Sequence, residues 1–190
     1  MSGEIDTDDM GSAEYGTLER VPGGISVLRY RRRLAHPPQK VWRALTEDAH
    51  LAEWFPTTIE GERTAGASLH FSFRENEAEP FDGEMLVFDA PILMELRWSD
   101  DVLRFELSAD GSGCVLDLTV TFPEYAKAAR DAAGWHECLD RLSHAAGGTS
   151  PAPWGDRWRQ VHPVYVDRLG SAAATIGPPA GWEEHTRSQA

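Results

Sequence analysis

The sequence predicts an α+β fold in which an antiparallel sheet is covered by one long helix near the C-terminal end. Segments between residues 67 and 122 alternate apolar and polar side chains, with the period of half-buried strands. Short turn-like stretches such as "SDD" and "ADGSG" separate them, so neighbouring strands are expected to pair as antiparallel hairpins. A helical pattern then runs from about Tyr125 to Ala146, and such a helix can cover the apolar face of the sheet.

One strand and two short helices are expected before this sheet region. The stretch "ISVLRYRRRL" (25–34) predicts a strand with a basic exposed side. The stretch "PPQKVWRALT" (37–46) predicts a helix, because proline is tolerated in a first turn and apolar residues follow at helical spacing. A second short helix is expected over "EDAHLAEWF" (47–55), where Pro56 ends it.

The strands that follow each keep one apolar face. Leu69, Phe71 and Phe73 share a face of the first strand, and His70 lies on the other face. The segment 81–89 is apolar on both parities near its end, so either a β-bulge or burial on both faces is expected there. The predicted strands are 67–74, 81–89, 92–99, 101–110 and 114–122.

Composition excludes several classes of partner. The 190 residues carry 18 Lys and Arg against 31 Asp and Glu, a formal net charge of -13, which argues against binding nucleic acid or an anionic membrane surface. No apolar run is long enough to span a membrane, and "MSGEIDTDDM" has no signal-peptide pattern. The two cysteines, Cys114 and Cys138, form no disulfide framework. We therefore expect a cytoplasmic protein.

The chain ends differ from the middle in composition. The predicted organisation is an acidic disordered leader (1–24), a folded domain (25–148) and a C-terminal extension with a short helical segment and a loose tail (149–190). In the extension, Trp154, Trp158 and Val161 recur at helical spacing, and Pro163 is expected to interrupt or restart the helix. This apolar stripe packs either on the domain's own flank or against a second copy, as a homodimer contact.

The stretch "AAGWHECLDRL" (132–142) places an imidazole, a carboxylate and a thiol on consecutive residues. At 100° per residue, Trp135 and Leu139 fall on the inner stripe of the helix, whereas His136 and Glu137 fall on a solvated outer face. The three groups therefore cannot converge on one atom. A zinc-protease helix would need a second histidine where Asp140 stands. The stretch predicts neither a catalytic group nor a metal site, and no cofactor is expected.

Three stretches in order, "PPQKVWRALTEDAHLAEWF", "GEMLVFDAPILMELRW" and "AAGWHECLDRL", resemble one branch of the START-like (SRPBCC) superfamily. This branch contains proteins similar to the C-terminal domain of the heat-shock-protein-90 ATPase activator. The resemblance covers about residues 25–148. It implies a helix-grip fold, a curved antiparallel sheet wrapped around the long helix, with a cavity between them that can hold an apolar small molecule.

The aromatic inner face, with polar groups directed outward, favours a binding domain for a small apolar or aromatic ligand over an enzyme. The same side chains either line a cavity or fill the core, and their periodicity does not distinguish the two. The candidate ligand-binding residues are Trp54, Phe55, Phe71, Phe73, Met85, Trp98, Phe105, Trp135 and Leu139.

Two other functions are kept as alternatives. An enzyme similar to polyketide cyclases or hydrolase-like relatives needs an ionisable group in the cavity, for which Asp82, Glu84 and His136 are the candidates. The first two face inward only if a bulge shifts the register of their strand. A co-chaperone that activates an ATPase is suggested by the family name alone.

Overall fold

The computed structural model describes residues 15–73 and 78–178 and confirms the α+β class. One eight-stranded sheet has the order β1-β2-β8-β7-β6-β5-β4-β3, and all neighbours in it are antiparallel. The strands are β1 (Thr17–Arg20), β2 (Ser26–Leu34), β3 (Thr57–Glu60), β4 (Ser68–Phe73), β5 (Phe81–Asp89), β6 (Leu93–Trp98), β7 (Asp101–Asp110) and β8 (Gly113–Phe122). The helices are α2 (Pro38–Thr46), α3 (Asp48–Trp54), η2 (Tyr125–Lys127), α4 (Ala128–Gly147), α5 (Asp156–Leu169) and η3 (Ser171–Ala174).

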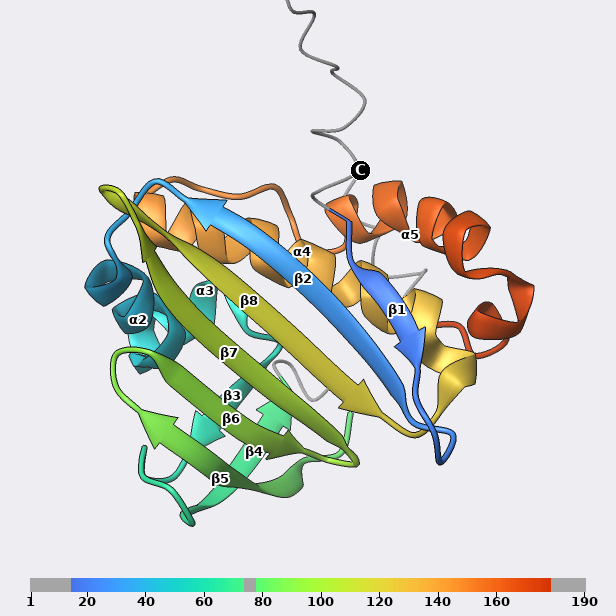
Figure 1. Ribbon diagram of the computed structural model, residues 1–190, viewed down its shortest axis with the longest axis horizontal. Helices are drawn as coiled ribbons and strands as arrows, with labels where there is room; N and C mark the ends of the chain where they lie inside the picture. Colours follow the sequence, from blue (N-terminus) through green and yellow to red (C-terminus); the bar gives the residue numbers. More distant parts are fainter. Residues whose placement is uncertain (1–14, 74–77, 179–190) are drawn as a thin grey trace, which may run out of the picture.

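The long helix α4 lies across the inner face of the sheet, as the helix-grip prediction requires. Figure 1 shows the long strand β2 passing in front of α4 with β8 beside it, α2 and α3 at one end of the helix and α5 beside the other. None of the helices in the described ranges is long and apolar enough to cross a membrane.

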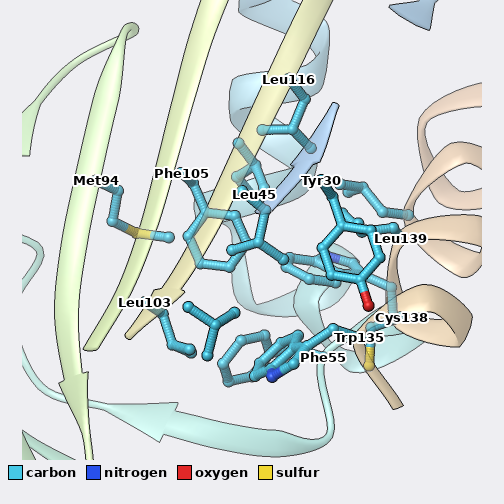
Figure 2. Close-up of a cluster of buried hydrophobic side chains, with 14 of the residues drawn as sticks. Tyr30, Leu45, Phe55, Met94, Leu103, Phe105, Leu116, Trp135, Cys138 and Leu139 are labelled. Carbon is cyan, nitrogen blue, oxygen red and sulfur yellow. The ribbon is translucent and has the colours of Figure 1, made fainter. Parts of the chain in front are cut away.

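The core between sheet and helix is aromatic and tightly packed. Figure 2 shows Phe105 and Leu103 of the sheet directed toward Trp135 and Leu139 of α4. All four side chains are at most 4% exposed. Trp54 contacts the Phe105 ring edge-on, with centroids 5.9 Å apart, and its Nε1 donates to the Ala44 carbonyl at 2.8 Å. Burial on this scale supplies most of the free energy of folding.

Strands β1 and β3 were not predicted. Residues 17–20 fall in the expected disordered leader but pair with β2, with Leu18 opposite Leu28, so the prediction is wrong for them. Glu19 also pairs with Arg29 at 2.8 Å. Residues 1–14 and the tail from 179 lie outside the described residues. Both strands are only four residues long. Such short segments form strands only by pairing with a neighbouring strand, and the local sequence does not reveal that neighbour.

Strand β5 contains a β-bulge, one of the two explanations that its apolar pattern allowed, the other being burial on both faces. Its register against β6 shifts between Met85 and Val87. The shift lies C-terminal to Asp82 and Glu84, so these two residues keep the outward parity of the regular strand. The bulge therefore does not turn them into the interior.

Pro163 does not interrupt the C-terminal helix, and that prediction is wrong. Helix α5 runs continuously through it. A proline inside a helix removes one backbone hydrogen bond, but Val161 and Tyr165 are both fully buried and anchor the helix. Trp158 and Val161 of the stripe thus pack on the chain's own α4, as in the first of the two alternatives, whereas Trp154 is exposed and stacks on Arg141.

Two glycines give a matched test of how closely β5 packs against β6. A methyl group at Gly83 would lie 2.1 Å from the Arg97 carbonyl oxygen and 2.7 Å from the Phe71 ring. We expect Gly83→Ala to lower the free energy of unfolding by about 1–3 kcal/mol, because β5 must move away from β6. Urea denaturation measures the change.

Gly134 is the control, since a methyl group there meets no described atom within 4 Å beyond its own helix backbone. Gly134→Ala should raise the free energy of unfolding by about 0.5–1 kcal/mol, because alanine has the higher helix propensity. Equal effects of the two substitutions would contradict the assigned pairing of β5 and β6.

Candidate functional site

A hollow of about 250 Å³ lies where the ends of β4, β5 and β6 face the residues just before α4. Three of its walls are aromatic rings, and its rim is polar. The lining residues are Phe73, Phe81, Trp98, Ser99, Asp100, Asp101 and Lys127. All three rings are half-buried, so part of their apolar surface is accessible from outside.

Trp98 is the centre of the aromatic wall. Its ring centroid lies 5.4 Å from that of Phe81 and 6.3 Å from that of Phe73, both in the hollow. Behind these rings it contacts the buried rings of Trp135 at 5.6 Å and Phe55 at 6.5 Å. The hollow is thus continuous with the aromatic core, which holds its back wall rigid.

Strand pairing places these rings together. Phe81 begins β5 opposite Phe71 of β4, and Phe73 lies two residues further along the same face. Trp98 ends β6 opposite Gly83 of β5, where a side chain would collide with the Arg97 carbonyl oxygen and the Phe71 ring. Ser99 follows in a two-residue hairpin with φ 58°, a left-handed conformation that tight hairpin turns require.

The polar rim is held by a partly buried ion pair. Lys127 Nζ lies 2.8 and 2.7 Å from the two carboxylate oxygens of Asp101 and 3.2 Å from Asp131 Oδ2. Asp101 is 2% exposed, and this burial raises the pKa of its carboxyl group against the opposing effect of Lys127. The pair joins the start of β7 to the residues before α4, so it fixes the width of the rim.

Two of the predicted ligand-binding residues, Phe73 and Trp98, line this hollow. The structure brings Trp135 and Phe55 directly behind them. The remaining five are fully buried core residues: Trp54, Phe71, Met85, Phe105 and Leu139.

Sequence reasoning missed Phe81 and the Asp101–Lys127 pair. Phe81 has the same parity as Gly83 and Met85, so the inward alternation of its strand was a usable signal. The ion pair joins residues 26 positions apart and had no sequence signal.

A second hollow, of about 520 Å³, is larger but has a different character. It lies between the α2–α3 junction and the β3–β4 turn, and Ile59 is its one large apolar side chain. Arg63 crosses it and donates to Asp48 Oδ1 at 2.8 Å and to two backbone carbonyls. None of the predicted ligand-binding residues lines it. The aromatic hollow is therefore the better candidate despite its smaller volume.

His136 lies in the interior, which corrects the expectation of a solvated position. It is fully buried beneath α5, with Nδ1 3.0 Å from Tyr165 Oη and Nε2 3.1 Å from Arg157 Nη2. A guanidinium group can only donate, so Nε2 accepts and the Nδ1–H donates to Tyr165. The ring is thus neutral, and burial lowers its pKa to about 4 despite Asp140 nearby.

Glu137 is also buried, at 3% exposure, because α5 covers this side of α4 as well. Its Oε1 accepts a hydrogen bond of 2.8 Å from the backbone N–H of Gly155, the residue that precedes α5. Burial raises the pKa of this carboxyl group to about 7, against the opposing effects of Gly155 and Arg141. One side chain of α4 thus caps the N-terminus of the next helix.

The residues proposed for catalysis line neither hollow. Asp82 is exposed on the outer face of the sheet, where its Oδ1 is 2.7 Å from His70 Nδ1. Glu84 is half-buried on the same face, opposite Ser68 and Arg97. Within residues 15–73 and 78–178, no group of three His, Cys, Asp or Glu side chains could hold a metal ion. Cys114 and Cys138 are buried, and no disulfide joins them.

We expect the stability of the protein to depend on pH through Glu137. Its folded pKa lies above its ordinary value of 4.5, so its contribution is present below pH 4.5 and is lost as the pH rises through about 7. His136 acts in the opposite direction, because its contribution is lost as the pH falls from 6.5 through about 4. Over pH 4.5–6.5 the two groups therefore change the free energy of unfolding with pH in opposite directions, and their effects offset each other.

In Glu137→Gln the pH dependence that His136 gives to the free energy of unfolding is no longer offset by Glu137. The free energy of unfolding of this variant, relative to the unchanged protein, should therefore rise between pH 4.5 and 7, by on the order of 1–3 kcal/mol. Urea denaturation at a series of pH values measures it. Glu62→Gln, on an exposed loop residue, is the control and should show no such trend. A pH-independent difference for Glu137→Gln would contradict the buried position of this carboxyl group.

Comparisons with known structures agree with this architecture. The Enterococcus faecalis conserved protein of unknown function EF2215 superposes with a TM-score of 0.71 at 21% identity, over 86% of this chain and 97% of that chain. CalU16 from Micromonospora echinospora has a TM-score of 0.65 at 21% identity, over 82% and 96%. DynU16, a putative protein in the dynemicin biosynthetic locus, has a TM-score of 0.58 at 23% identity, over 65% and 48%. These likenesses concern the fold.

No curated protein sequence matches the chain. The family described as "Activator of Hsp90 ATPase homolog 1-like protein" matches residues 35–147, which include α2, α3, most of the sheet and α4. The resemblance seen in the sequence is therefore confirmed. The chain belongs to the Activator of Hsp90 ATPase homolog 1-like family, within the START-like (SRPBCC) superfamily.

Proposed function

We propose that this chain is a non-catalytic binding domain that holds one small apolar or aromatic molecule in the hollow at Trp98. The observation that carries the proposal is the aromatic wall of Phe73, Phe81 and Trp98. These rings are only half-buried although they continue a fully buried aromatic core. Covering their accessible surface with a ligand removes apolar area from water at about 25 cal/mol per Å².

Two further observations support a small ligand. Pockets for drug-sized ligands occupy roughly 300–1,000 Å³. A hollow of about 250 Å³ therefore suits a molecule of one or two rings. DynU16, which shares the fold, is described as a putative protein of a biosynthetic locus, and that setting agrees with a small-molecule ligand. The proposal keeps the cytoplasmic location expected from the sequence.

The alternatives lack a comparable structural feature. The enzyme interpretation depended on Asp82, Glu84 and His136, and none of them reaches the aromatic hollow. A proton-transfer group has to lie within hydrogen-bond distance of its substrate. The co-chaperone interpretation rests on the family description, and stimulation of a cognate chaperone's ATP turnover is its separate test.

Binding of 6-propionyl-2-(dimethylamino)naphthalene tests the proposal, because this uncharged dye has two rings and brightens in apolar surroundings. We expect saturable binding to the full chain. Phe73→Ala should weaken it about 10-fold, since the substitution removes on the order of 1–2 kcal/mol of apolar contact. The dissociation constants come from fluorescence titration, and thermal melting confirms that the variant is folded.

Trp154→Ala is the matched control. Trp154 is an exposed aromatic residue that stacks on Arg141, away from the hollow. This substitution should leave the dissociation constant unchanged. The proposal fails if the dye does not bind saturably, or if Trp154→Ala weakens binding as much as Phe73→Ala does.

A further inference from the structure

We propose that the hollow selects uncharged ring compounds that carry a hydrogen-bond acceptor, and that the indole N–H of Trp98 receives this acceptor. The inference rests on the proposed function and specifies the class of ligand. Three features of the described residues carry it: the Trp98 nitrogen, the hydrogen-bonding state of Lys127 and the charges on the rim.

The Trp98 N–H is a buried donor that the protein leaves unused. Among the described residues, no hydrogen-bond acceptor reaches its Nε1, although this atom is buried. Other indoles of the chain are satisfied: Trp54 Nε1 donates to the Ala44 carbonyl at 2.8 Å, and Trp158 Nε1 donates to the Arg130 carbonyl at 3.1 Å. Buried donors are nearly always paired in folded proteins. Because Nε1 itself is closed off, an acceptor bound in the hollow that Trp98 lines reaches this donor only if the indole ring shifts.

The surroundings of Trp98 explain why the protein supplies no acceptor. The described neighbours that its ring contacts are the rings of Phe55, Phe73, Phe81 and Trp135, whose centroids lie 5.4–6.5 Å away. Their interplanar angles with Trp98 are 61–78°, so the rings meet edge to face. Phenylalanine rings offer no lone pair, and the indole of Trp135 is a donor only. An acceptor on a bound ring would therefore be the first strong partner for this nitrogen.

The single ammonium group in the wall is already engaged. Lys127 has three N–H donors, and three carboxylate oxygens lie within 3.2 Å of its Nζ, two on Asp101 and one on Asp131. A ligand carboxylate would find no donor left there. It would also face the exposed carboxylate of Asp100 on the rim. Like charges in a partly desolvated site repel each other, so the hollow discriminates against anions.

Naphthalene, quinoline and 2-naphthoate are suitable probes. Quinoline is uncharged at pH 8 and has the shape of naphthalene, but its ring nitrogen accepts a hydrogen bond. 2-Naphthoate keeps the two rings and adds a negative charge. Isothermal titration calorimetry and ligand-detected NMR give the dissociation constants with the full chain.

We expect Trp98→Phe to weaken the binding of quinoline about 3- to 10-fold more than that of naphthalene, the range for one neutral hydrogen bond. In ¹H–¹⁵N spectra of the unchanged protein, quinoline should move the Trp98 indole N–H resonance downfield, whereas naphthalene should not. 2-Naphthoate should bind at least 10-fold more weakly than quinoline. Trp154→Phe is the control and should change none of these ratios.

The outcomes separate the two proposals. If naphthalene and quinoline bind but Trp98→Phe affects both equally, or if 2-naphthoate binds as tightly as quinoline, the acceptor selectivity is wrong while the binding function stands. If none of the three probes binds at millimolar concentration to the folded protein, the proposed function itself fails and the selectivity with it.

Discussion

The packing of α4 against the inner face of the sheet is the interaction on which the other features depend. Trp135 and Leu139 of this helix are buried among side chains of several strands. Neighbouring strands direct their apolar side chains to this inner face together only when they pair in the correct register. The same tryptophan supports Trp98 from behind, at a centroid distance of 5.6 Å. Since one helix orders both the core and the back wall of the hollow, any substitution that displaces α4 is expected to disturb stability and binding together.

Helix α4 is buried on a second side, by α5 and the residues before β1, and this layer is polar. His136 is held neutral and Glu137 caps α5, so burial shifts their pKa values in opposite directions. Each group loses hydration that its new hydrogen bonds only partly replace. Tyr165 joins the layer, because its hydroxyl accepts from His136 and from the Gly16 backbone N–H at 2.8 Å. Two segments far apart in the sequence are thereby fixed to one helix.

The aromatic hollow forms beside the residues that precede α4, where rings of β4, β5 and β6 remain half-buried. The partly buried Asp101–Lys127 pair closes one side of it. A buried ion pair contributes little net stability in general, because the cost of removing two charges from water offsets their attraction. Here the pair neutralises the one ammonium group of the rim. The aromatic walls are apolar, and the proposed selectivity depends on the buried, unpaired indole N–H of Trp98 beside them.

The α+β class, the order of the main strands and helices, and the inward direction of Trp98, Phe73 and Trp135 could all be predicted from the sequence, because they follow from local periodicity. Periodicity could not show which aromatic side chains are sealed in the core and which border a hollow, since both kinds share one face of a strand. It also placed His136 in water, because a single amphipathic stripe implies only one buried side. These points depend on contacts between distant segments of the chain. The covering elements, α5 and the Asp101–Lys127 pair, come from residues distant in the chain, and burial is a property of all the layers that meet around a side chain.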